Sequence, residues 1–189
     1  DNRVTYALTV GKHKAEIDYI VDPGKAYRLN SFFREPADSA LKPLIDTLVE
    51  QNQAYRLWWP VNLNALNDAK DKLAIELRDR GYYDASPDLF RYEIDTLADK
   101  KEGAVFLKLS NPANQSKFQR YKFGATYMNI ICSDIYLENH WPQSHSSKGK
   151  HFQLNHYPIK GNIMDQVVSI DSGTWFSQSV TNQTYVALV

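Results

Sequence analysis

The sequence predicts an α+β fold of tandem β-α-α-β-β modules, each with two helices packed on a small three-stranded mixed sheet. Leucines at helical spacing between residues 62 and 80 form one apolar stripe. Residues 90–95 alternate between apolar and charged side chains, as a half-buried strand does. The order of strand, helix and aromatic connector then recurs further along the chain, which is typical of a repeated unit.

A complete module is expected over residues 24–112, where it follows an Asp-Pro-Gly turn signature. Residues 25–34 are typical of its first strand. Asp38 or Ser39 can cap the helix that follows. Pro43 is tolerated because it lies in or near the first turn, where backbone N–H groups have no helical partner.

The second helix of this module carries the stronger signal. Asn62 or Asn64 can cap its start, and Gly81 lies where a helix needs a left-handed residue to end. Residues 89–96 and 104–110 then form an antiparallel hairpin. The first strand reaches the sheet after crossing over two helices, so it can run parallel to one hairpin strand.

Residues 1–23 are expected to be the closing hairpin of a preceding module. Apolar and polar residues alternate over residues 3–9 and 14–21, on either side of a loop that contains Gly11. An isolated hairpin is at best marginally stable. These two strands therefore need a helix layer that the chain does not provide before them.

Residues 113–189 are expected to be the first part of a following module, truncated before its hairpin. Residues 117–135 are strand-like, and residues 138–151 are expected to be a polar loop. Residues 158–170 predict a weaker helix, because glycine at position 161 disfavours helix formation. The expected apolar face of this helix is Ile159, Ile163, Val167 and Ile170.

A last helix is capped by Ser177 or Ser179. It follows an aromatic connector at Trp175 that mirrors the one at Trp58, and we expect the two tryptophans to occupy equivalent places. The chain opens on polar residues rather than a signal peptide and stops inside a helix pattern. We therefore expect it to be an excised piece of a longer protein.

Composition argues against several classes of protein. The 22 basic and 22 acidic residues cancel, which disfavours a binder of duplex nucleic acid. The single cysteine, Cys132, excludes a disulfide framework and a CxxC metal site. No apolar run approaches the roughly 18–20 residues that a membrane-spanning helix needs. The 12 tyrosines suit strands and peptide-contacting surfaces.

Catalytic signals are weak. Four histidines lie close together, but none has the His-x3-His spacing of a helical metal site, and a solvated loop explains them better. Cys132 is best interpreted as a buried, inert thiol, although a pair with His140 is conceivable. We therefore expect no enzyme activity and no catalytic, cofactor-binding or metal residues. The rival interpretation is a small α+β ligand- or metal-binding domain or enzyme, with its site in the 136–157 loop. The clustered histidines are His140, His145, His151 and His156.

Several short phrases resemble the polypeptide-transport-associated (POTRA) domains of outer-membrane insertases of the BamA and TamA type. The phrase LAIELRDRGYYD at residues 73–84 is similar to the end of the second helix in that family, and VDPGKAYRL at residues 21–29 to a joint between domains. The phrases FRYEIDT at 90–96, VFLKL at 105–109 and DSGTWFS at 171–177 look like TamA-like lipoproteins of Bacteroidetes. The Trp-Trp-Pro connector departs from the family pattern.

The resemblance implies a periplasmic arm attached to a C-terminal membrane β-barrel, on the periplasmic side of the bacterial outer membrane. Its partners would be unfolded outer-membrane protein clients and accessory assembly proteins, with no nucleic acid and no cofactor. A three-stranded sheet leaves exposed edges, where a client strand can pair through backbone hydrogen bonds. A solvated rim without binding, or a purely structural spacer, are the alternatives. The expected client-facing edge consists of Phe90, Arg91, Tyr92, Glu93, Ile94 and Asp95.

Overall fold

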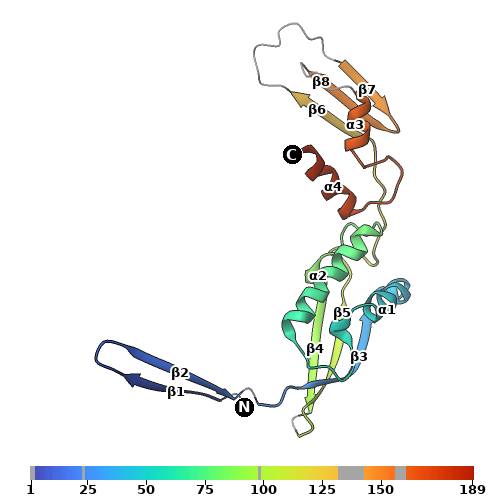
Figure 1. The fold of residues 1–189 in the computed structure, drawn as a ribbon. Coiled ribbons are helices and arrows are strands. Elements are labelled where there is room, and N and C mark those ends of the chain that lie inside the picture. The colour runs from blue at the N-terminus through green and yellow to red at the C-terminus, as the bar shows by residue number, and fades with distance from the viewer. Residues whose placement is uncertain (1–2, 23, 98, 132–142, 156–160) are drawn as a thin grey trace.

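The chain forms three separate sheets that follow one another along an elongated molecule (Figure 1). The structure is a computed structural model, and it describes residues 3–22, 24–97, 99–131, 143–155 and 161–189. Within these ranges no sheet joins the opening and closing segments of the chain. The prediction of successive modules is therefore confirmed at the level of architecture.

The first sheet is the predicted hairpin of β1 (Arg3–Val10) and β2 (Ala15–Asp22). The two strands pair antiparallel along their whole length, and every residue in them is exposed. The register places apolar residues together on one face, while the other face is mostly polar. No described element covers the apolar face. That face consists of Val4, Tyr6, Leu8, Val10, Ala15, Ile17, Tyr19 and Val21.

The second sheet belongs to the central unit and has the strand order β3-β5-β4. The chain enters it at β3 (Arg28–Pro36) and returns through β4 (Phe90–Leu97) and β5 (Glu102–Leu109). Between these strands lie α1 (Lys42–Glu50) and α2 (Leu63–Asp79). β3 pairs parallel with β5, and β4 pairs antiparallel with β5, as predicted for a crossover followed by a hairpin. Short 3-10 turns lie at Ser39–Leu41, Gln53–Tyr55 and Pro87–Leu89.

Both helices of the central unit bury their apolar stripe against one face of this sheet. Leu73 and Leu77 of α2 are at most 2% exposed, and they share a core with Leu107 of β5. Burying one such leucine is worth about 1.5–3 kcal/mol. The remaining fully buried members of this core include Leu41, Ile45, Val49, Leu66, Ala69, Ala74, Phe90 and Leu109.

The ends of the two helices show which predicted cap is used. The Asp38 side chain accepts from the backbone N–H of Ala40 at 3.0 Å and so caps the 3-10 turn that leads into α1, whereas α1 itself has no side-chain cap. Asn62 accepts from Asn64 at 3.0 Å and from Ala65 at 3.2 Å, so Asn62 rather than Asn64 is the cap of α2. Gly81 has φ +96°, the left-handed conformation that favours glycine.

The third sheet has the order β6-β8-β7 and corrects the sequence analysis. Residues 143–147 and 150–155 are strands β7 (Gln143–Ser147) and β8 (Lys150–Asn155), so the prediction of a polar loop is wrong from residue 143 onward. They form a hairpin on β6 (Thr126–Ile131), parallel to β8. The connecting turn has φ +49° at Lys148 and +75° at Gly149, the pattern of a type I′ turn.

This hairpin precedes the helices α3 (Gly161–Val167) and α4 (Gln178–Leu188), whereas the hairpin of the central unit follows its helices. The third unit therefore contains a hairpin within the segment that was expected to be a polar loop. In both sheets the first strand pairs parallel with the third and the second lies at the edge, and only the place of the helices in the chain differs.

The helix predicted over residues 158–170 is shorter and faces differently from the expectation. Met164 and Val168 are buried against Phe152 of β8, whereas Ile163 is 47% exposed. The expected Ile159 lies outside the described residues. Gly161 lies within α3, and a Cβ placed there would lie 2.3 Å from Cγ of His145. Close approach to the sheet therefore requires glycine.

The strand predicted over residues 117–135 is also shorter. Only Thr126–Ile131 lies in the sheet. Residues 121–123 instead pair with residues 174–176, and residues 132–135 lie outside the described part of the chain.

A polar network joins the central unit to the third unit. The carboxylate of Asp79, at the end of α2, accepts from Ser177 Oγ at 2.9 Å, from Ser179 N at 2.8 Å and from Ser179 Oγ at 2.6 Å. The Arg120 guanidinium lies 3.9 Å from the ring of Trp175, and its Nε donates to the Arg80 carbonyl at 2.8 Å. Asp79 therefore caps the N-terminus of α4 from the neighbouring unit.

Candidate protein-binding edge

The central sheet leaves β4 unpaired along one side. In the order β3-β5-β4, only β5 has a neighbour on both sides among the described strands. The start of β3 is partly covered, because Leu29 exchanges hydrogen bonds with Trp58 N and Trp59 O of the connector. The end of β3 is Pro36, which has no N–H to donate. β4 is therefore the more open edge of this sheet.

The pairing of β4 with β5 decides which backbone groups face outward. Ser110 N donates to Leu89 O at 2.9 Å, so this opposed pair is a hydrogen-bonded one. Opposed pairs in an antiparallel ladder alternate between bonded and non-bonded. The bonded pairs of β4 are accordingly at residues 91, 93 and 95. The N–H and C=O groups of residues 92, 94 and 96 point away from β5 and are available to an added strand.

Three of the six predicted site residues serve the core instead of the edge. Phe90, Tyr92 and Ile94 pack into the central core. Tyr92 Oη lies 2.6 Å from Tyr55 Oη and donates to the Leu66 carbonyl at 2.9 Å. Burial raises the pKa of the Tyr92 hydroxyl to about 12. These side chains fix β4 in place, while its backbone stays open.

The other three predicted residues lie on the open face of the sheet. Glu93 carboxylate and Lys108 Nζ are 2.6 Å apart, and the hydrogen bond from Lys108 lowers the pKa of Glu93. The same ammonium is 3.9 Å from Glu35 on β3. On the same face Phe106 lies opposite Glu93 and stacks on Phe33 of β3, with ring centroids 4.8 Å apart. Arg91 and Asp95 are exposed on either side of Glu93.

The sequence predicted this strand but did not include Thr96 among the site residues. It also did not show which residues of the strand have backbone N–H and C=O groups that face outward. Thr96 is exposed and belongs to the set whose backbone faces outward. Proline at residues 91, 93 or 95 would therefore not test this edge. Their N–H groups bond to β5, so proline there would weaken the sheet itself instead of blocking its edge.

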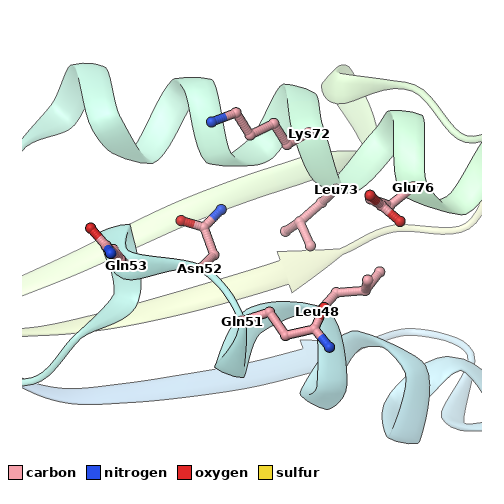
Figure 2. Close-up of a pocket in the computed structure, with 7 residues that line it drawn as sticks. All are labelled: Leu48, Gln51, Asn52, Gln53, Lys72, Leu73 and Glu76. Carbon is pink, nitrogen blue, oxygen red and sulfur yellow. The ribbon is translucent and has the colours of Figure 1, made fainter.

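A groove lies on the helix side of the central unit (Figure 2). It has a volume of about 410 Å³, with Leu48 and Leu73 at its floor and Lys72 and Glu76 of α2 along one wall. The opposite wall carries amides from the end of α1 and the turn that follows. No nucleophile, histidine or carboxylate pair lines this groove, so it provides surface contact and no recognisable chemistry. The amide residues are Gln51, Asn52 and Gln53.

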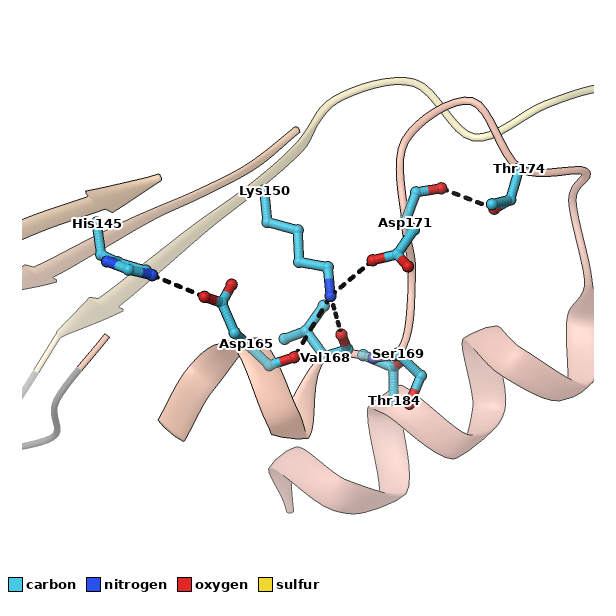
Figure 3. A network of polar contacts seen from close by, with 8 residues as sticks. All are labelled: His145, Lys150, Asp165, Val168, Ser169, Asp171, Thr174 and Thr184. Carbon is cyan, nitrogen blue, oxygen red and sulfur yellow. Dashed lines mark hydrogen bonds and ion pairs between the residues drawn. The ribbon is translucent and has the colours of Figure 1, made fainter. Parts of the chain in front are cut away.

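The rival site in residues 136–157 falls largely on the third sheet and on residues outside the described part. Two described histidines of this segment have structural partners. His145 Nε2 lies 2.8 Å from Asp165 Oδ2 (Figure 3). His151 Nδ1 lies 3.0 Å from Ser146 Oγ. The hydrogen bond with His145 lowers the pKa of Asp165. Cys132, His140 and His156 lie outside the described residues.

Lys150 is the most buried charge in this region, at 4% exposure. Its Nζ donates to the Val168 carbonyl at 2.5 Å and pairs with Asp171 at 2.9 Å (Figure 3). Cations near carbonyls at a helix C-terminus are stabilising. Lys150 therefore holds the end of α3 on the sheet. No group of three metal-ligating side chains occurs among the described residues.

Comparisons with known proteins show which solved structures have a similar architecture. No protein-family model matches the chain, and a search of curated proteins found no match. The chain is similar to a crystal structure of Haemophilus influenzae BamA POTRA3-5, at a TM-score of 0.52 and 13% identity, over 99% of this chain and 60% of that one. The chain has the fold of tandem POTRA domains. It spans less than two thirds of the length of that structure.

Two further POTRA structures overlap less well. One is Haemophilus ducreyi BamA lacking POTRA domains 1-3, with a TM-score of 0.39 and 15% identity over 66% of this chain and 22% of that one. The other is POTRA1-3 of the periplasmic domain of Omp85 from Anabaena, with a TM-score of 0.31 and 11% identity over 98% and 63%. None of the three is a Bacteroidetes TamA-like lipoprotein, so that finer resemblance stays a prediction. In the described part of this POTRA-like chain, no helix has the length and apolar character to cross a bilayer.

Proposed function

We propose that this chain is a segment of the periplasmic arm of an outer-membrane β-barrel assembly or translocation protein, and that β4 binds unfolded clients or accessory proteins by strand pairing. The observation that supports this most is the open edge of β4 within a POTRA-like sheet. Strand addition obtains its affinity from backbone hydrogen bonds, so it places little demand on client sequence. The proposed function is binding and scaffolding, without catalysis.

The exposed hairpin fits the same proposal. Its apolar face corresponds to the face of β4 and β5 that the central helices cover. We assign residues 1–23 to a preceding POTRA-like unit, whose helices would cover this face. Residues 24–112 are then the complete unit, and residues 113–189 belong to the following one. Beyond the 112 boundary, Phe118 also packs into the central core.

A spacing role has its own support. Asp79, Ser177 and Ser179 tie the central and third units through three hydrogen bonds, which favours a fixed angle between them. A rigid arm would hold the β4 edge at a set distance from the barrel. Spacing and client binding are compatible, and the experiment below separates them.

The test replaces Thr96 with proline. This change removes an outward N–H and fills the edge with the pyrrolidine ring, while the bonds to β5 at residues 93 and 95 remain. The matched control is Thr96→Val, which keeps the N–H and favours a strand. The probe is a fluorescent peptide of about ten residues that alternates apolar and polar side chains, as membrane β-strands do.

We expect Thr96→Pro to weaken peptide binding at least about fivefold, the worth of one lost hydrogen bond. Thr96→Val should bind as the parent chain does. Amide exchange of residues 92, 94 and 96 should slow when the peptide binds. If the proline variant binds equally well, β4 is a solvated rim and the chain's contribution is spacing alone.

A further inference from the structure

The central and third units each have a connector before their last helix, and the backbone hydrogen bonds of the two connectors correspond one to one. In the central unit, Val61 N donates to Tyr27 O at 2.8 Å and Leu29 N donates to Trp59 O at 2.9 Å. In the third unit, Phe176 N donates to Tyr121 O at 2.9 Å and Phe123 N donates to Thr174 O at 2.8 Å. The equivalent helix caps, Asn62 and Ser177, follow directly.

This equivalence corrects the pairing of the two tryptophans. Trp58 N donates to Leu29 O, and Gly173 N donates to Phe123 O in the same way. Trp58 therefore corresponds to Gly173, and Trp175 corresponds to Pro60. Both equivalent positions are left-handed, with φ +67° at Trp58 and +81° at Gly173. A non-glycine residue there carries about 1–2 kcal/mol of strain.

In the third unit the end of α2 packs on part of this connector, while Trp175 itself remains 45% exposed. Tyr121 N donates to the Gly81 carbonyl at 2.8 Å. Tyr83 packs edge-on against Phe176 at 5.0 Å, and a Cβ on Gly81 would lie 3.4 Å from the Trp175 ring. The helix end that carries Gly-Tyr-Tyr is thus seated on an aromatic connector, with Asp79 capping the next helix.

In the central unit the corresponding surface is more apolar, with Tyr27 and Val61 half-buried and the other residues exposed. We define the connector surface as Tyr27, Trp58, Trp59, Pro60, Val61 and Leu63. Leu63, which corresponds to Gln178 at the covered joint, is 61% exposed. Trp58 is 56% exposed and Trp59 is 46% exposed. The strain at Trp58 is therefore not offset by burial of its ring in this chain.

The hairpin indicates what would cover the connector surface. In the central unit, α2 packs along the hairpin with Leu73 and Leu77, and its end then meets the next connector. Only residues 23–26 separate the end of β2 from Tyr27. Four residues reach at most about 14 Å. A helix lying on the apolar face of β1 and β2 would therefore end within reach of the connector surface.

We propose that the connector surface is the docking site for the C-terminal end of such a helix, carrying a glycine followed by aromatic side chains as residues 81–83 do. The joint between the central and third units is its internal precedent. This proposal depends on the repeated architecture and not on client binding at β4.

The test uses this chain and a peptide that copies residues 66–84, held helical by a lactam bridge between Lys72 and Glu76. The peptide contains no tryptophan, so any fluorescence change comes from the chain's four tryptophans, of which Trp58 and Trp59 lie on the connector surface. The disrupting variant is Leu63→Asp, since an acidic residue in the first turn of α2 is favourable for the helix itself. The control is Tyr127→Ser, which removes a 78% exposed aromatic from the third sheet.

We expect a saturable blue shift with a Kd near or below about 1 mM. Leu63→Asp should weaken peptide binding at least about tenfold, while the melting temperature of this variant stays equal to that of the parent chain or rises. Tyr127→Ser should leave peptide binding unchanged. Absence of a saturable shift, or equal binding by Leu63→Asp, would overturn the proposal. A shift produced by phosphatidylglycerol vesicles but not by the peptide would assign the surface to lipid instead.

Discussion

Replacing Asp79 with asparagine should loosen α4 without unfolding the central unit. The carboxylate receives three hydrogen bonds from Ser177 and Ser179, and α4 has only Thr184 buried among its described side chains. Asparagine keeps one acceptor but turns an N–H donor group toward Ser179. Loss of a helix cap costs about 0.5–2 kcal/mol. We therefore expect α4 to open roughly 3–30 times more often.

Hydrogen–deuterium exchange at neutral pH measures this opening. The amides of α4 should exchange faster in Asp79→Asn by that factor, while those of β5 stay protected. Glu76→Gln is the matched control, because Glu76 lies on the same helix and pairs only with Arg80. If Asp79→Asn leaves α4 exchange unchanged, or if Glu76→Gln accelerates it equally, the carboxylate does not hold the joint.

The pKa of Asp79 adds a pH dependence to the same experiment. Desolvation raises the pKa of this carboxyl, but the hydrogen bonds from Ser179, Ser177 and Gln178 outweigh it and leave the pKa below its usual value. A lowered folded-state pKa stabilises the joint above the unfolded value of about 3.9. That stabilisation is lost as pH falls through the lower folded value. The wild-type α4 should therefore loosen in acid, and Asp79→Asn should not.

Two further predictions concern the cores of the units. Gly161→Ala should destabilise the third unit by about 1–3 kcal/mol, because the new methyl group meets the His145 ring, whereas Gly124→Ala, with open space around it, should change the melting temperature little. Stability should fall between pH 10 and about 12, because burial raises the pKa of Tyr55 and Tyr92 and their hydroxyls are neutral when folded. Tyr92→Phe should flatten that fall in denaturant titrations, and an unchanged slope would show that the pair does not titrate on unfolding.

The central unit was largely predictable because its signals are local. Asn62 and Gly81 bracket α2 through bonds within a few residues, and the alternation at residues 90–95 fixes which side chains face the core. Periodicity and capping depend only on neighbouring residues, so a single sequence suffices to reveal them. The resemblance to POTRA domains then pointed to the same fold as the structural similarity.

In the third unit, local sequence patterns were not enough to predict the strands. The turn at Lys148 and Gly149 was a usable hairpin signal, but polar residues on both sides hid the strands. Whether β8 pairs with β6 is decided by partners 24 residues apart, as Thr126 and Lys150 are. The short strand β7 has no apolar alternation that the sequence could display.

By itself, the sequence determined the repeated α+β architecture, the candidate helix caps of the central unit and the strand that forms the edge of its sheet. Only the tertiary structure decided that the backbone of residues 92, 94 and 96 faces outward, that Gly161 is required by His145, and that Asp79 caps a helix about 100 residues later. Local patterns set each element because the chain's near neighbours carry that information. Joints and registers depend on which distant surfaces meet, and that is settled by packing.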